Sequence, residues 1–81
     1  MKYSFWYGTE MPITADSDRV GIMEEGGGIV KATITQIYRA MEARKPLIIA
    51  RDKIDEKRDP PVATAEIINT GLVRRITIDL S

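Results

Sequence analysis

The chain has 81 residues, 43% of them hydrophobic, and its 12 basic and 12 acidic residues give a formal net charge of zero. This length suits one small domain with a single core, and neutrality excludes a global field that would attract nucleic acid or a membrane surface. The absence of cysteine and histidine excludes disulfides, thiolate nucleophiles, thiolate zinc sites and the commonest general base. An enzyme is therefore the least favoured class, and neither a cofactor nor a metal is expected.

Charge is distributed unevenly along the chain. Residues 1–25 carry two basic and five acidic side chains, whereas residues 31–58 carry eight basic and four acidic ones. An anionic partner is therefore expected to bind the middle of the chain. No apolar run approaches the roughly 20 residues of a membrane span, and the N-terminus lacks the pattern of a secretory signal, so a cytoplasmic location without a membrane partner is predicted.

Two extended segments are predicted first. Residues 2–7 are rich in aromatic side chains, which favour a strand, and Trp6 lies on the opposite face from the other three, Tyr3, Phe5 and Tyr7. These aromatics suit a core or a subunit interface, and stacking on nucleic-acid bases is the alternative. Residues 10–15 continue as a second extended segment, which Pro12 confines to a sheet edge or a strand start.

Residues 16–25 fit either a short strand or a short helix capped at Asp16 or Ser17, and the strand is favoured. Three glycines follow, and a tight structural turn is the favoured interpretation of them. The alternative is an anion site, in which backbone N–H groups at a helix start bind a phosphate through Gly26, Gly27 and Gly28.

The clearest helical pattern spans residues 30–44. Its apolar side chains recur at helical spacing and predict one buried stripe of Val30, Ile34, Ile37, Tyr38 and Met41. Pro46 prevents the helix from continuing. Because Thr33 and Thr35 are weak helix formers, residues 29–34 could instead be extended, which would shorten the helix to residues 35–45.

The apolar run at residues 47–50 predicts a buried central strand, and residues 51–61 a charged loop. Residues 62–68 and 72–80 are predicted to form a β-hairpin, because residues 69–71 supply a three-residue turn with Gly71 where a positive φ is expected. These elements predict one α+β domain over residues 1–81, in which a single main amphipathic helix packs on a mostly antiparallel sheet and a β-hairpin closes the chain.

From about Val20 onward, the order of elements resembles the Alba family of small nucleic-acid-binding proteins. The shared elements are a strand ending in a glycine turn, the helix over residues 30–44, the strand at 47–54, a charged hairpin arm and a closing strand at 74–80. The resemblance covers roughly three quarters of the chain. It implies a hairpin arm that approaches nucleic acid, carrying Lys53, Lys57 and Arg58.

Three classes of function remain after these exclusions. The first is sequence-independent nucleic-acid binding through that arm, helped by Arg39 and Arg44 on the outer face of the helix. The alternative for the arm is a solvent-exposed loop in which acidic residues largely cancel the basic ones. The second is protein binding or self-assembly, as in a small phage-type inhibitor. The third is anion or small-ligand binding at the glycine turn. Small size, an expected edge strand and the aromatic N-terminus favour a homo-oligomer.

Overall fold

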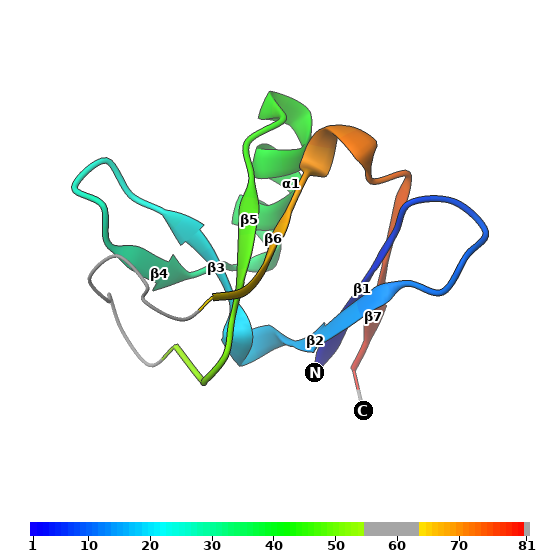
Figure 1. Cartoon of the computed structure of the whole chain (residues 1–81), viewed down its shortest axis with the longest axis horizontal. Coiled ribbons are helices and arrows are strands. Elements are labelled where there is room, and N and C mark those ends of the chain that lie inside the picture. The colour runs from blue at the N-terminus through cyan, green and yellow to red at the C-terminus, as the bar shows by residue number, and fades with distance from the viewer. Residues whose placement is uncertain (55–63, 81) are drawn as a thin grey trace.

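The computed structural model describes residues 1–54 and 64–80. Within them lie seven β-strands, one α-helix and two short 3-10 helices, η1 (Ser17–Arg19) and η2 (Thr70–Leu72) (Figure 1). The strands and the α-helix follow one another as β1 (Lys2–Trp6), β2 (Ile13–Asp16), β3 (Val20–Met23), β4 (Ile29–Lys31), α1 (Ile34–Ala43), β5 (Leu47–Ala50), β6 (Thr64–Ile68) and β7 (Arg75–Asp79).

The strands form two antiparallel sheets. Sheet A has the order β2-β1-β7, and sheet B has the order β4-β3-β5-β6. The chain passes between the sheets twice, because η1 joins β2 to β3 and η2 joins β6 to β7. Figure 1 shows sheet A on the right, with sheet B and α1 to its left. The predicted α+β class, with one helix packed on antiparallel sheet, is confirmed.

The first strand has the two faces that its aromatic residues predict. Tyr3 and Phe5 point into the core and are 2% and 0% exposed. Trp6 lies on the outer face, where its indole N–H donates a hydrogen bond to the Thr77 hydroxyl (3.1 Å) and the Arg75 guanidinium lies 4.6 Å from its ring centroid. The alternative prediction that Tyr3 and Phe5 stack on nucleic-acid bases is therefore wrong, because both rings lie inside the protein.

The main core fills the space between the two sheets and α1. Its buried residues are Tyr3, Phe5, Ala15, Val20, Ala32, Ile37, Ala40, Leu47, Ile49 and Ile68. A second, smaller cluster contains Ile29, Ile48, Ala50 and Ile54. Since successive side chains of a strand point to opposite faces, β5 contributes alternately to the two clusters and is buried on both sides. The predicted central strand at residues 47–50 is confirmed.

The predictions for residues 10–25 are confirmed in part, because the second extended segment is present but begins at Ile13. β2 starts after Pro12 and forms one edge of sheet A. Residues 16–25 contain the favoured strand, β3, with the short η1 before it. β3 lies at the centre of sheet B, between β4 and β5. The kink at η1 therefore turns one continuous stretch of extended chain from the edge of sheet A into the middle of sheet B.

The helix is shorter than the pattern over residues 30–44 predicts. Residues 29–31 form β4, which pairs with β3 so that Val30 lies opposite Ile22. The longer helix is wrong and the shorter alternative is confirmed, since α1 spans Ile34–Ala43. The physical reason is that β-branched side chains such as Ile29 and Val30 favour strands, where β3 offers them backbone partners.

A capping box starts α1. The Thr33 hydroxyl accepts a hydrogen bond from the Gln36 backbone N–H (3.2 Å), and the Gln36 side-chain oxygen accepts one from the Thr33 backbone N–H (2.9 Å). These bonds satisfy two donors that the start of a helix otherwise leaves without partners. The helix therefore has a defined first residue directly after β4.

We expect Thr33→Ala to lower the free energy of unfolding by about 1 kcal/mol, because the helix start loses its hydroxyl acceptor. Thr35→Ala is the matched control, since Thr35 is also exposed but lies inside the helix, where alanine is the better helix former. Urea denaturation of both variants measures the difference. Equal stability of the two would contradict a stabilising cap at Thr33.

The buried face of α1 is rotated relative to the predicted stripe. Ile37 and Ala40 are buried and Met41 is half-buried, whereas Ile34 and Tyr38 are 37% and 52% exposed. The predicted burial of Ile34 and Tyr38 is therefore wrong. The small Ala40 side chain lets the helix backbone approach the strands closely, and turning Ala40 inward turns Ile34 and Tyr38 away from the core.

The two predicted C-terminal strands are present as β6 and β7, joined at the predicted turn over residues 69–71. They lie in different sheets, because β6 pairs with β5 and β7 pairs with β1. The buried Thr70 hydroxyl donates a hydrogen bond to the Lys45 carbonyl oxygen (2.7 Å), which holds the turn against the end of α1 and directs β7 toward sheet A. Gly71 lies in η2, and among the described residues the glycine with a positive φ is instead Gly27 (87°).

Candidate binding groove

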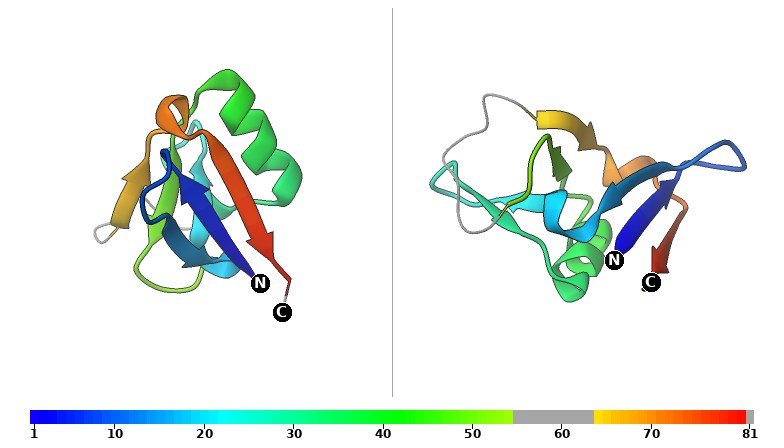
Figure 2. Two further views of the ribbon diagram at one scale, coloured as in Figure 1. Left: turned by 90° about the vertical axis from the view of Figure 1, so that its right-hand side faces the viewer. Right: turned by 90° about the horizontal axis from the view of Figure 1, so that it is seen from below.

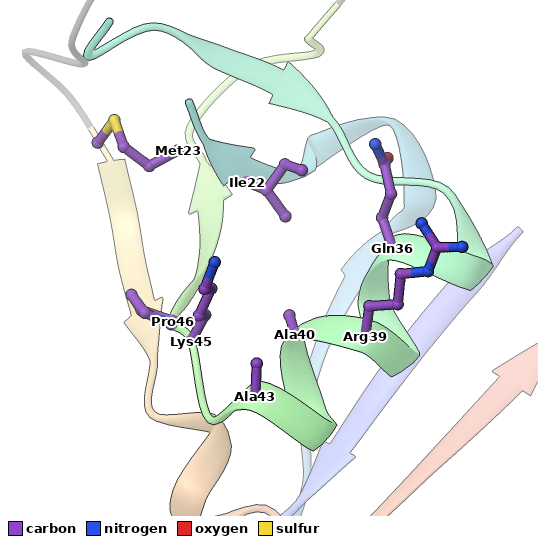
Figure 3. Close-up of a pocket in the computed structure, with 8 residues that line it drawn as sticks. All are labelled: Ile22, Met23, Gln36, Arg39, Ala40, Ala43, Lys45 and Pro46. Carbon is purple, nitrogen blue, oxygen red and sulfur yellow. The ribbon is translucent and has the colours of Figure 1, made fainter. Parts of the chain in front are cut away.

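A groove of about 420 Å³ runs between α1 and strand β3 of sheet B (Figure 3). Three parts of the chain line it. β3 contributes Ile22 and Met23, α1 contributes one flank, and the connection from α1 to β5 contributes Lys45 and Pro46. The lining residues from the helix are Gln36, Arg39, Ala40 and Ala43.

The floor of the groove is apolar because the helix carries small side chains there. Ala40 and Ala43 are three residues apart, so they lie on the same flank of α1. Across from them, Ile22 is half-buried and Met23 is 47% exposed. The methyl groups of two alanines cannot fill the space that larger side chains would occupy, and a hollow remains between helix and strand.

The rim of the groove is polar and positively charged. Arg39 and Lys45 are exposed cations, and Figure 3 shows both side chains at the groove beside the apolar residues. The Gln36 side-chain oxygen is used in the capping box, which leaves its amide N–H groups as donors. No carboxylate is among the described lining residues, so the groove combines apolar surface with hydrogen-bond donors and positive charge.

The position of Lys45 is fixed by the way α1 ends. Arg44 is the C-cap and adopts the left-handed conformation (φ 54°), and the Lys45 N–H donates a hydrogen bond to the Ala40 carbonyl oxygen (2.9 Å). The Lys45 carbonyl oxygen in turn accepts the hydrogen bond from Thr70. Both the N–H and the carbonyl oxygen of Lys45 are therefore hydrogen-bonded, which fixes the backbone that carries the Lys45 side chain.

The predicted nucleic-acid-binding residues fall into two groups. Arg39 and Arg44 are exposed near the C-terminal end of α1. Lys53 is exposed beyond the other end of β5, so the strand separates it from the C-terminal end of the helix (Figure 1). Lys57 and Arg58 lie outside the described residues. Arg39 lines the groove together with Lys45, which the sequence did not single out, whereas Arg44 is absent from that lining.

Gly26, Gly27 and Gly28 form the turn between β3 and β4. The Glu24 N–H donates to the Gly28 carbonyl oxygen (2.8 Å), and the Gly27 N–H donates to the Glu24 carbonyl oxygen (2.9 Å). The helix begins only at Ile34. The premise of an anion site at a helix start is therefore wrong, and the structural turn is confirmed.

Among the described residues, the titratable groups with displaced pKa values lie away from the groove. Burial raises the pKa of the Tyr3 phenol. Burial also raises the pKa of the Tyr7 phenol, with a smaller contribution from the negative charge of Glu66. In residues 1–54 and 64–80, no group of three or more acidic side chains could hold a metal ion, and no helix is long and apolar enough to cross a membrane.

Comparison with known proteins finds no matching family model, no similar curated protein and no similar solved structure. The resemblance to the Alba family thus stays a prediction from the sequence. The arrangement of the groove itself is what bears on function. An apolar floor with two cations and an amide at its rim is suited to binding, and its described lining contains no hydroxyl, thiol or carboxylate that could act as a nucleophile or a general base.

Proposed function

We propose that this chain is a small, non-enzymatic protein-binding module whose groove takes an acidic segment of a partner protein. The observation that carries the proposal is the pairing of an apolar floor with the cations Arg39 and Lys45 on one surface. Carboxylates of the segment would pair with these cations. An apolar side chain of the segment would cover Ala43 and Met23, which are exposed in the free protein.

The size of the groove fits this kind of ligand. Its volume of about 420 Å³ lies at the lower end of the range of roughly 300–1,000 Å³ for ligand pockets, so it suits a few side chains rather than a large cofactor. Exposed ion pairs contribute only about 0.2–1 kcal/mol each. The cations would therefore select a partner segment of negative charge and raise its rate of association, whereas apolar contact would supply most of the affinity.

Sequence-independent binding of nucleic acid is the second candidate. What favours it is that Arg39, Arg44 and Lys45 are all exposed around the C-terminal end of α1. Phosphate groups are attracted to such clusters without any reading of bases. On duplex DNA, affinity would then fall with salt with a log–log slope of roughly 0.9 per phosphate neutralised. The acidic-segment proposal differs from this one because it requires the apolar floor as well as the charges.

Fluorescence polarisation tests the two candidates with two probes. The first is a short labelled peptide with glutamates around a pair of leucines, and the second is a labelled DNA duplex of arbitrary sequence. We expect the peptide to bind, and the double variant Arg39→Glu/Lys45→Glu to weaken binding by about tenfold, which corresponds to roughly 1.4 kcal/mol. Arg44→Glu is the matched control, because it makes the same kind of charge change at the helix end but Arg44 does not line the groove.

Three results would contradict the acidic-segment proposal. One is equal binding of a peptide in which lysines replace the glutamates. Another is loss of peptide affinity in Arg44→Glu as large as that in the double variant. The third is tight, salt-dependent binding of the duplex with no binding of the peptide, which would favour the nucleic-acid candidate.

A further inference from the structure

Strand β7 is an edge of sheet A. It pairs with β1 on one side, from Lys2 opposite Asp79 to Trp6 opposite Arg75. In the part of the chain that the structure describes, no strand pairs with its other side. An edge strand presents a row of backbone donors and acceptors that a further strand can use. The other side of β7 is therefore a place where a second chain could extend the sheet.

The sequence of β7 is complementary to itself. It reads Arg75, Ile76, Thr77, Ile78, Asp79. If two copies paired antiparallel about a two-fold axis at Thr77, Arg75 would face Asp79 of the second copy, and Ile76 would face Ile78 of the second copy. Opposite charges and apolar side chains are both favourable cross-strand pairs. The same axis repeats each pair, as a closed two-fold interface requires.

The two faces of β7 suit this arrangement. Arg75, Thr77 and Asp79 are exposed on the outer face, where ion pairs across the axis would stay in contact with water. The Arg75 guanidinium already lies over the Trp6 ring. Stacking uses the face of the guanidinium and leaves its in-plane N–H groups able to bind a carboxylate. Ile76 and Ile78 are only half-buried on the inner face.

Helix α1 offers apolar surface on the same side of the molecule. Ile34 and Tyr38 lie on the flank of α1 away from Ala43 and the groove, as helical periodicity requires. Ile34 lines a shallow hollow together with Met1 and Tyr3 at the start of β1. The left view of Figure 2 shows α1 beyond β7, on the side away from β1. A strand added beside β7 would extend the sheet toward this exposed flank.

The other edge strands are less suitable. If two copies of β6 paired antiparallel about an axis at Glu66, this residue would lie opposite Glu66 of the second copy, which is a like-charge pair. β4 has only three residues. In β2, antiparallel pairing about the middle of the strand would place Ile13 opposite Asp16 of the second copy, an apolar residue against a carboxylate. Among the edge strands of the two described sheets, β7 is the one whose sequence is complementary to itself in antiparallel pairing.

We propose that two copies of this chain pair antiparallel through β7, with the two-fold axis at Thr77, and join their three-stranded sheets into one continuous sheet. The interface is separate from the groove between α1 and β3, so each copy keeps its groove. The homo-oligomer that the sequence predicts is thereby assigned a surface and a register, and both follow from the charge pattern of β7.

Charge reversal tests the register. Arg75→Asp alone would place two carboxylates opposite each other across the interface, and Asp79→Arg alone would place two guanidinium groups together. Each variant should therefore lower dimer affinity at least tenfold in sedimentation experiments. An equal mixture of the two variants should form a heterodimer, because in the proposed register the mixed interface places every carboxylate opposite a guanidinium.

Asp16→Arg is the matched control for the charge reversals. Asp16 also lies opposite Lys2, as Asp79 does, but on the other edge of the sheet. We therefore expect this variant to keep wild-type dimer affinity. Failure of the mixed variants to associate would contradict the proposed register.

A second measurement does not depend on these charges. The chain has no cysteine, so Thr77→Cys introduces a unique thiol at the proposed axis. We expect rapid oxidation to a covalent dimer, and no such product from Thr14→Cys on the same outer face of β2. The proposal is overturned by a monomeric wild-type mass at all concentrations, by a dimer that both charge reversals leave intact, or by equal cross-linking at the two cysteine positions.

Discussion

Phe5→Ala should lower the free energy of unfolding by about 3–5 kcal/mol, because it removes a large aromatic ring from the main core and leaves a cavity. The Phe5 side chain is 0% exposed. It lies on the middle strand of sheet A, between Ile13 of β2 and Ile76 of β7. In a domain of this size the loss corresponds to a fall in melting temperature of roughly 10–40 °C. Thermal and urea denaturation followed by circular dichroism measure it.

Trp6→Ala is the matched control for this prediction. Trp6 is the next residue and a larger aromatic, but it lies on the outer face with one hydrogen bond to Thr77 and one stacking contact with Arg75. Loss of these exposed interactions should cost only about 1–2 kcal/mol. If Trp6→Ala destabilised the protein as much as Phe5→Ala, the assignment of the two faces of β1 would be wrong.

Strands could be predicted from the sequence where burial alone determines the pattern of apolar residues. In β1 the aromatic residues alternate, and Tyr3 and Phe5 are buried as expected. β5 is a continuous apolar run and is buried on both faces. In both strands the apolar pattern of the sequence matches the burial of the side chains, so the pattern alone predicts the strand and its buried faces.

The start of the helix was harder to predict, because two patterns overlap there. Val30 continues the helical spacing of the apolar residues but belongs to β4. The deciding signal was local, since Thr33 followed by Gln36 three residues later is a capping box and marks the true start. The apolar stripe also misplaced the buried face, because periodicity does not reveal that Ala40 rather than Tyr38 faces the core.

Neither proposed binding surface could be predicted from one segment alone. The groove needs Met23 from β3, Ala43 from α1 and Lys45 from the following turn to meet. The edge at β7 depends on β6 and β7 lying in different sheets, which the buried Thr70 makes possible. Small residues at positions 40 and 43 beside Arg39 were the only local signal of the groove.

The two flanks of α1 explain why an apolar stripe remains exposed on so short a helix. One flank, with Arg39 and Ala43, faces the groove at sheet B. The opposite flank, with Ile34 and Tyr38, lies away from the groove, and Ile34 lines a hollow with Met1 and Tyr3. Only the part between them, around Ile37, is needed to close the core. Ile34 and Tyr38 therefore stay exposed because neither the core nor the groove uses their flank of the helix.

Gly21→Val should destabilise the protein by about 3 kcal/mol or more, because β3 approaches its neighbours too closely at this point for any side chain. A Cβ at Gly21 would lie 2.8 Å from the Val30 carbonyl oxygen and 2.7 and 2.9 Å from side-chain carbons of Ile29 and Ile54. The carbonyl belongs to the paired backbone of β4, so it cannot move without disturbing the ladder.

The consequence extends beyond one clash, because Ile54 is part of the smaller core cluster and its N–H donates a hydrogen bond to the Asp18 carbonyl oxygen (2.7 Å). A side chain at Gly21 should therefore displace the segment after β5 as well as the β3–β4 hairpin. Gly26→Ala is the matched control in the same hairpin, since a Cβ there meets nothing within 4 Å. Hydrogen exchange should show faster exchange at Ile54 in Gly21→Val and unchanged exchange in Gly26→Ala. Wild-type stability and exchange in Gly21→Val would mean that Ile54 does not pack against β3 as described.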